Sequence, residues 1–305
     1  MTITPAIKKD YITKLAEQGK RVDGRTFDQY RPIEIETDVV KQAEGSARVK
    51  IGNTQLVVGI KMGVGEPFPD TPDCGVLSTA AEFVPLASPD FESGPPREDA
   101  IELARVVDRG VRESEVVDIK KLVMTPGEKV WLVFIDIHIL DYDGNLFDAA
   151  SLGALAALMT TKIPIVRLLG PGGGLEKSDL EAWYNTTKIQ DIYDLYTMPG
   201  FDELIAGNNK EMLHKVKPVP LPMTEPPISC TAIKINDYVM FDASLDEETI
   251  ADVRLTVATD HKGDLRAMQK GLSGSFSREE IQKVINGALV NGQEIRRQLY
   301  AKIGK

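Results

Sequence analysis

The chain has 305 residues, of which 42% are hydrophobic and 27% are charged. These proportions are ordinary for a globular protein and exclude disordered and collagen-like classes. Its 36 Lys and Arg against 46 Asp and Glu give a net charge of −10, which disfavours a protein that binds duplex DNA by neutralising phosphates. A local cluster of arginines could still bind nucleic acid. Cys74 and Cys230 form no CxxC pair, so a disulfide framework and a zinc ribbon are excluded.

No segment has the ~18–20 uninterrupted apolar residues that a membrane span requires. Residues 1–19 carry five charges and no apolar core, unlike a secretory signal. We therefore expect a soluble, cytoplasmic protein that does not bind a membrane. The three histidines, His138, His214 and His261, are too scattered to predict a metal cage, and we expect neither a metal ion nor a cofactor.

The first half of the chain is predicted to contain a helix, then strands, then two more helices. Thr4 and Pro5 open the first helix, and Ile7, Tyr11 and Leu15 repeat every four residues before Gly19 ends it. Strands are predicted over 31–40, 47–51, 55–61, 76–86 and 130–140, with a loop over 62–73 and a hairpin turn at 52–54. Helices are predicted over 98–115 and 147–160, and the second is so rich in Ala and Leu that it must be buried.

The stretch 168–227 differs in character, with a glycine run, an acidic helical patch and a proline run. We interpret it as a linker with a helical insertion around 180–196. Strands over 228–235, 238–242, 251–259 and 265–270 and a closing helix over 277–303 follow. Both halves place helices on antiparallel strands, which predicts the α+β class. The predicted segments are an N-terminal helix and arm (1–30), a first half (31–167), the linker (168–227) and a second half (228–305).

The sharpest feature is a row of three arginines in the predicted helix 98–115. Arg105, Arg109 and Arg112 are spaced i, i+4 and i+7, so they project from one helical face. Guanidinium groups bind phosphate oxygens bidentately, and this row could hold several phosphates along a strand. The spacing alone favours a solvated face paired with neighbouring carboxylates, because surface charge rows are common. The apolar stripe of this helix is predicted to be Ile101, Ala104, Val107 and Val111.

Three other motifs have both a functional and a structural interpretation. The run Gly170–Gly174 lacks the ending of a P-loop, which favours a flexible linker over a phosphate loop. Asp136 and His138 share a strand face, but the carboxylates that follow are typical turn residues, which favours a structural role over a metal site. The acidic run 242–252 could supply carboxylates for acid–base or metal chemistry, although such loops are usually only solvated.

Several separated motifs, in the same order, identify the chain as similar to the RNase PH superfamily. The loop 65–72 and the stretch 242–252 resemble, more particularly, the non-catalytic ring subunit of the archaeal exosome. The similarity covers about residues 1–165 and 226–303. The motifs are Val-Asp-Gly-Arg at 22–25, the arginine-bearing helix at 96–109, Asp-Gly-Asn at 143–145 and Gly-Ser-Phe-Ser at 274–277.

The resemblance implies an RNase PH-like fold of the ribosomal protein S5 domain 2 kind, with two β-sheet/helix halves. It also implies a hexameric ring of three heterodimers with a catalytic RNase PH-like subunit. RNA-binding cap subunits and single-stranded RNA are further partners that it implies.

Departures from the family pattern imply that this chain has lost its own reaction. Active members bind inorganic phosphate with a Gly-Gly-Thr-Arg-like turn, where this chain has Leu146 and Phe147. An apolar pair cannot neutralise a dianion and leaves its desolvation uncompensated. Asp242 matches one catalytic aspartate, Glu248 replaces the second, and Arg254 stands where a further carboxylate is usual. The resemblance therefore implies a degenerate active site without a catalytic residue.

Arg105 and Arg109 match positions at which the inert subunit offers arginines to RNA bound at its partner's active site. Arg112 matches a further basic position. We therefore expect a non-catalytic structural and RNA-binding subunit that supports 3′-to-5′ phosphorolytic RNA degradation by its partner. Two alternatives stay open: an active phosphorolytic 3′–5′ exoribonuclease, and a nucleotide-dependent kinase that uses Gly170–Gly174.

Overall fold

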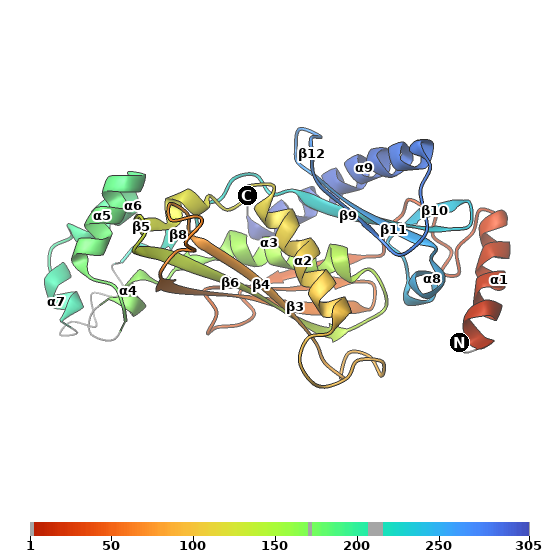
Figure 1. Cartoon of the computed structure of the whole chain (residues 1–305), viewed down its shortest axis with the longest axis horizontal. Helices are drawn as coiled ribbons and strands as arrows, with labels where there is room; N and C mark the ends of the chain where they lie inside the picture. The colour runs from red at the N-terminus through yellow and green to blue at the C-terminus, as the bar shows by residue number, and fades with distance from the viewer. Residues whose placement is uncertain (1–2, 170–172, 207–215, 305) are drawn as a thin grey trace.

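A six-stranded sheet and a four-stranded sheet form the two halves of the molecule (Figure 1). The computed structural model describes residues 3–169, 173–206 and 216–304. In the first sheet the strand order is β1-β2-β3-β6-β4, and β5 pairs with β6. Its strands are β1 (Ile33–Thr37), β2 (Gly45–Ile51), β3 (Thr54–Gly65), β4 (Val76–Phe83), β5 (Val123–Thr125) and β6 (Lys129–Asp141).

The predicted hairpin is confirmed, and β6 lies within one residue of the predicted strand 130–140 at each end. β2 and β3 pair antiparallel around the turn at 52–53, and β3 extends to Gly65, four residues beyond the predicted strand end. Only β4 runs parallel to its neighbour β6, because the chain returns through a helix between them. One face of β6 is completely buried; it consists of Trp131, Val133, Ile135, Ile137 and Ile139.

Two helices cover the first sheet. α3 (Leu146–Thr160) packs on β2 and β3, α2 (Glu98–Arg112) packs on β4, and the two helices touch. Gly153 permits the close approach of α3, because a Cβ there would lie 2.8 Å from Val58 and 2.9 Å from Leu56. The burial expected for the Ala-rich helix is confirmed from Leu146 to Leu158.

The second half is an antiparallel sheet in the order β10-β9-β11-β12. α9 packs on β9 and β11, and Ser277 caps its start in a capping box with Glu280. The short helix α8 falls in the acidic run, where the sequence indicated a loop. The elements are β9 (Ile228–Ile235), β10 (Tyr238–Phe241), α8 (Leu245–Ile250), β11 (Val253–Thr259), β12 (Leu265–Gly271) and α9 (Arg278–Ile303).

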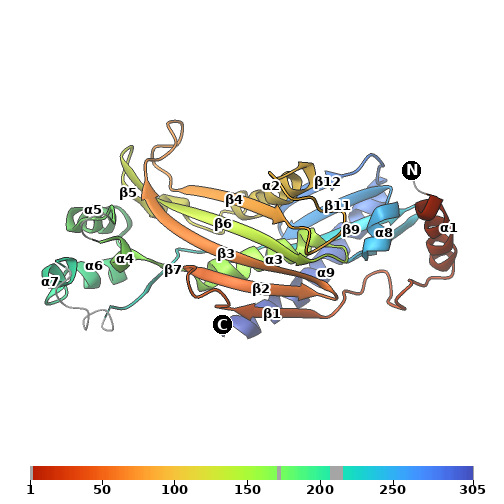
Figure 2. The ribbon, with the colours of Figure 1, turned by 90° about the horizontal axis from the view of Figure 1, so that it is seen from below.

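The segment interpreted as a linker contains packed helices of its own. Trp183 of α5 is buried against Trp131 of β6, with ring centroids 5.4 Å apart, and its indole N–H donates to the backbone O of Lys121 at 2.7 Å. α5–α7 lie at the end of the molecule opposite to α1 (Figure 2). The elements within this segment are α5 (Lys177–Thr187), α6 (Gln190–Tyr196), α7 (Phe201–Ile205) and β8 (Val219–Pro220). Three short elements precede them in the chain: η1 (Ile119–Leu122), β7 (Lys162–Ile163) and α4 (Ile165–Leu168).

Two predicted apolar stripes are partly wrong. α1 (Ile3–Glu17) buries Ile12 and Ala16, whereas Tyr11 is 57% exposed; the side chain of Ile7 lies outside the described residues. On α2, Ile101 is 49% exposed, and Leu103 takes its place in the core. On α1 the buried stripe is rotated by one position, whereas on α2 the predicted Ala104, Val107 and Val111 are buried and only Ile101 is wrong. The packing partner, which the sequence pattern does not show, selects between neighbouring apolar residues. None of the described helices is long and apolar enough to cross a membrane.

Candidate RNA-binding surface and degenerate active site

The three arginines of α2 are all exposed but differ in how far they are engaged. Arg112 forms a bidentate pair with Asp108, both contacts at 2.9 Å, and also donates to the backbone O of Leu77. This hydrogen bonding raises the pKa of Arg112. Arg109 donates to the side-chain oxygen of Gln269 on β12, and Arg105 has no hydrogen-bond or ion-pair partner within the described part of the chain. Arg105 and Arg109 are therefore the arginines available to a phosphate.

Asp242, which directly follows β10, is a buried carboxylate that accepts hydrogen bonds from residues of the N-terminal arm and the first half. Its side chain is fully inaccessible, and Oδ1 and Oδ2 accept hydrogen bonds from Arg31 at 2.8 and 2.9 Å. Arg25 donates to Oδ2 and Asn145 to Oδ1, both at 2.8 Å. Burial opposes ionisation of Asp242, but the hydrogen bonds and charge of Arg31 outweigh it and lower its pKa. Both carboxylate oxygens are thus committed to structural partners.

The arm between α1 and β1 supplies these cations. Arg25 and Arg31 bind Asp242, and Arg21 forms a buried pair with Glu247 of α8, with contacts at 2.9 and 2.5 Å. The sequence motif at 22–25 pointed to this arm, but its spacing gave no sign that its arginines converge on the second half.

The first turn of α3 already holds a carboxylate. Glu248 Oε1 accepts a hydrogen bond from the backbone N–H of Asn145, the N-cap of α3, and Oε2 accepts from the hydroxyl of Tyr142; both distances are 2.8 Å. Desolvation raises the pKa of Glu248, and these two hydrogen bonds oppose the rise. A helix N-terminus favours an anion, and here that anion is supplied by the chain.

Leu146 and Phe147 are buried beside this carboxylate, 6% and 8% exposed. The guanidinium carbon of Arg254 lies 3.8 Å from the centroid of the Phe147 ring, a cation–π contact, and Arg254 also pairs with Glu102 at 2.5 Å. The guanidinium of Arg254 is therefore occupied by an aromatic face and a carboxylate.

A cavity of about 150 Å³ lies next to this corner. Among its lining residues, the carboxylates Asp99, Glu102 and Glu248 face a single cation, Arg254. Because opposing charges must be supplied to hold a phosphate dianion, this lining repels the ion rather than binding it.

Asp148, near the start of α3, is a buried carboxyl group that sequence reasoning did not single out. It accepts hydrogen bonds from the Tyr30 hydroxyl at 2.7 Å, from the backbone N–H and hydroxyl of Thr231 at 3.0 and 2.7 Å, and from Asn145 at 3.0 Å. Burial raises the pKa of Asp148 to about 6, against the effect of these donors. A lone acid within an Ala- and Leu-rich helix was the available signal.

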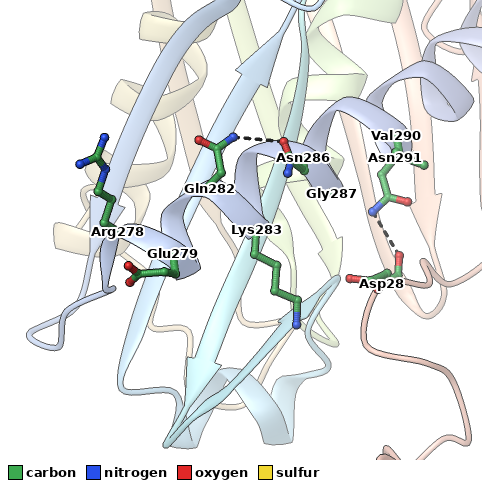
Figure 3. A pocket seen from close by; sticks show the side chains of 9 residues that line it. All are labelled: Asp28, Arg278, Glu279, Gln282, Lys283, Asn286, Gly287, Val290 and Asn291. Atoms are coloured by element: carbon green, nitrogen blue, oxygen red, sulfur yellow. Dashed lines mark hydrogen bonds between the residues drawn. The ribbon is translucent and has the colours of Figure 1, made fainter.

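A separate groove of about 720 Å³ runs along α9 (Figure 3). Asn291 donates a hydrogen bond to the backbone O of Asp28 at 3.1 Å, which ties α9 to the N-terminal arm. The lining charges are mixed, Arg278 and Lys283 against Asp28 and Glu279. The lining residues include no Ser, Thr, Cys or His, and no arginine of α2. The groove is therefore not part of the candidate RNA site.

The remaining candidate ligand motifs are the histidines and the glycine run 170–174. Within residues 3–169, 173–206 and 216–304 no group of three or more His, Cys, Asp or Glu is arranged to hold a metal ion. His138 lies 3.4 Å from Glu82 on the outer face of the first sheet. The proposed phosphate loop Gly170–Gly174 and the histidine His214 fall mostly or wholly outside the described residues.

Comparisons with known proteins agree with this fold. Residues 29–164 match the 3′ exoribonuclease family, domain 1, and residues 225–290 match domain 2 of that family. The chain is 45% identical over 305 residues to the exosome complex component Rrp42 of Thermococcus kodakarensis, covering 100% of this chain and 98% of the relative. It is 49% identical over 293 residues to Rrp42 of Methanocella arvoryzae, covering 96% and 95%.

Solved structures give the same result. A chain of the Archaeoglobus fulgidus exosome with RNA bound to the active site matches with a TM-score of 0.78 and 40% identity, covering 97% of this chain and 99% of that one. A chain of an archaeal exosome core matches with a TM-score of 0.75 and 37% identity, covering 97% and 98%. The expected α+β, RNase PH-like fold is confirmed, and the chain belongs to the RNase PH family of 3′ exoribonucleases.

Proposed function

We propose that this chain is a non-catalytic structural and RNA-binding subunit of an archaeal-type exosome ring. In that ring it supports 3′-to-5′ phosphorolytic RNA degradation by a catalytic RNase PH-like partner. Its full-length similarity to exosome components supports the assembly. The proposed particle is a cytoplasmic hexamer of three heterodimers, which also carries RNA-binding cap subunits and accepts single-stranded RNA.

The contact of Glu248 with the first turn of α3 carries the non-catalytic part of the proposal. An active phosphorolytic enzyme must hold inorganic phosphate in line with the last phosphodiester bond. Here a carboxylate takes the helix terminus, Phe147 takes the place of a guanidinium, and Asp242 is bonded to two arginines. This arrangement favours the non-catalytic subunit over the alternative of an active exoribonuclease.

Arg105 and Arg109 are the proposed RNA contacts. They stand on the exposed side of α2 and are less engaged than Arg112. A few convergent arginines can bind phosphates in a shared cleft even when the whole protein is acidic. Arg112, which was predicted to belong to the same row, is proposed to hold α2 to β4 and to contribute less to RNA.

The test is phosphorolysis by the chain alone, by the partner alone and by the mixture. RNA is incubated with inorganic phosphate, and the release of nucleoside diphosphates is measured. We expect no release by the chain alone and release by the mixture, with sedimentation giving a particle of six ring subunits. Robust release by the pure chain would overturn the non-catalytic role. A stable monomer indifferent to the partner would overturn the assembly.

A further inference from the structure

Three tyrosines form a cluster on the helical insertion, at the end of the molecule opposite to α1 (Figures 1 and 2). Tyr184 of α5 and Tyr193 and Tyr196 of α6 pack against one another with ring centroids 5.0, 5.5 and 6.1 Å apart. Tyr184 and Tyr196 are half-buried and support Tyr193, which is 41% exposed. None of the three hydroxyls has a hydrogen-bond partner among the described residues. The cluster thus presents one exposed aromatic side chain, Tyr193, supported by two others.

The surface around this tyrosine cluster is acidic. Residues 176–205 carry seven carboxylates and two lysines, a net charge of −5 within a chain whose total is −10. Glu181 is close enough to contribute to a raised pKa of Tyr196, after desolvation and the neighbouring Tyr193. Glu181 has no hydrogen-bond or ion-pair partner in the described part of the chain. Half of the net charge of the protein is therefore concentrated on one small helical unit.

The insertion already uses its aromatic rings to bind cations. The ammonium of Lys188 lies 5.1 Å from the centroid of the Tyr184 ring, and that of Lys177 lies 5.7 Å from the Phe201 ring. Both lysines within residues 176–205 therefore lie over an aromatic face. Tyr193 has no such cation among the described residues, although its ring is the most exposed of the three. An ammonium or guanidinium from outside would complete the same contact.

We propose that the tyrosine cluster, Tyr184, Tyr193 and Tyr196, is a docking site for a lysine- and arginine-rich segment of a protein partner. Cations stack on tyrosine rings, and the surrounding carboxylates attract and pair with them. Tyrosine is also enriched at binding hot spots, where its rigid ring offers a large contact area. RNA is the disfavoured occupant, because bases could stack on the rings but phosphates would meet a surface with a net negative charge, which includes Glu181, unpaired among the described residues.

The test uses the full chain and a fluorescent peptide of alternating arginine and glycine, titrated by anisotropy. Tyr193→Ala should weaken binding by roughly two- to fivefold, the effect of one lost cation–π contact, without any change in net charge. Tyr193→Phe should bind as the unchanged protein does. Tyr11→Ala is the matched control, because Tyr11 is 57% exposed on α1 at the far end of the molecule. Amide hydrogen exchange should show protection by the peptide in α5 and α6.

A second variant separates the cluster from general attraction to an acidic protein. Lys188→Asn should tighten peptide binding, because it frees the Tyr184 ring; Asn also tolerates the left-handed backbone at this position, φ 57°. Lys283→Asn removes the same charge from an exposed position of α9 and should change peptide binding less than Lys188→Asn does. Equal effects of Tyr193→Ala and Tyr11→Ala, or of the two lysine variants, would overturn the proposal. Protection of α5 and α6 by a single-stranded RNA oligonucleotide and not by the peptide would overturn it as well. Since the chain is tested alone, these outcomes do not depend on its place in a ring.

Discussion

The side chain of Glu248 accepts a hydrogen bond from the backbone N–H of Asn145 at 2.8 Å, across the boundary between the two halves. Asn145 is the N-cap of α3, in a left-handed conformation with φ 57°. A helix start with unpaired N–H groups is a natural phosphate site. In this protein an internal carboxylate, fixed on α8, fills that position. The contact joins the start of α3 in the first half to α8 in the second half.

Replacing Glu248 by Gln tests this joint. Desolvation raises the pKa of Glu248 in the folded state, so its favourable contribution is present at low pH and is lost as pH rises through the folded pKa. Glutamine keeps an acceptor for Asn145 and does not ionise. At pH 5, Glu248→Gln should therefore lower the free energy of unfolding by at most about 1 kcal/mol. By pH 8 the variant should have gained stability relative to the unchanged protein.

Urea unfolding at the two pH values measures this difference. The exposed Glu203→Gln variant is the control and should show no such pH-dependent gain. If the stability of Glu248→Gln relative to the unchanged protein decreases from pH 5 to pH 8, the assignment is wrong.

The buried pair of Arg31 and Asp242 should dominate the stability of the interface between the halves. Arg31→Ala leaves the Asp242 carboxylate buried with only Arg25 as a cation, and should cost about 3–5 kcal/mol in the free energy of unfolding. Arg48→Ala breaks an exposed pair with Glu36 and should cost under about 1 kcal/mol. Chemical denaturation of both variants at pH 7 checks the comparison. Similar costs for the two would show that burial does not set the difference.

Asp148 should make stability depend on pH in the opposite sense to Asp242. Its pKa is raised to about 6 from 3.8, so its contribution is full below about pH 4 and is lost as pH rises to about 7. The size is at most roughly 3 kcal/mol, at 1.36 kcal/mol per pKa unit. Asp148→Asn removes this titration, so its destabilisation should be larger at pH 4 than at pH 7. Asp28→Asn, at an exposed position, should show a constant difference; a constant difference for Asp148→Asn would refute the assignment.

The exposed arginines of α2 distinguish an RNA role from a solvated charge row. Rings reassembled with Arg105→Ala plus Arg109→Ala should stay intact, because neither side chain is buried, but should bind RNA more weakly and degrade it more slowly. Each lost phosphate contact should flatten the log–log salt dependence by roughly 0.7 for a single strand. Labelled RNA titrated at several salt concentrations gives this slope.

The matched control for the arginines removes the same two charges elsewhere. Arg278 and Arg297 lie at exposed positions of α9. Replacing both by Ala should leave the slope of the salt dependence and the degradation rate nearly unchanged. If the α2 variant behaves like the α9 variant, the row is only a solvated face.

Periodicity and turn chemistry by themselves determined the order of the main elements. The predicted strand 130–140 and closing helix 277–303 lie within one residue of β6 (Lys129–Asp141) and α9 (Arg278–Ile303) at each end. These signals are local: a strand buries alternate residues, and a capping box lies within four residues. The sequence motifs also indicated the RNase PH family and the apolar pair Leu146–Phe147.

Only the tertiary structure decided what those residues do. Asp242 and Arg31 are separated by 211 positions in the sequence, and Glu248 and Asn145 by 103. No local pattern encodes such pairings. The same holds for Tyr11 against Ile12 on α1, where both side chains are apolar enough to be buried and the packing partner selects one. The fold therefore follows largely from local pattern, whereas the arrangement of the candidate site follows from long-range pairing of buried charges. Burial makes that pairing decisive, because an ionised group removed from water must find its compensation wherever the chain brings it.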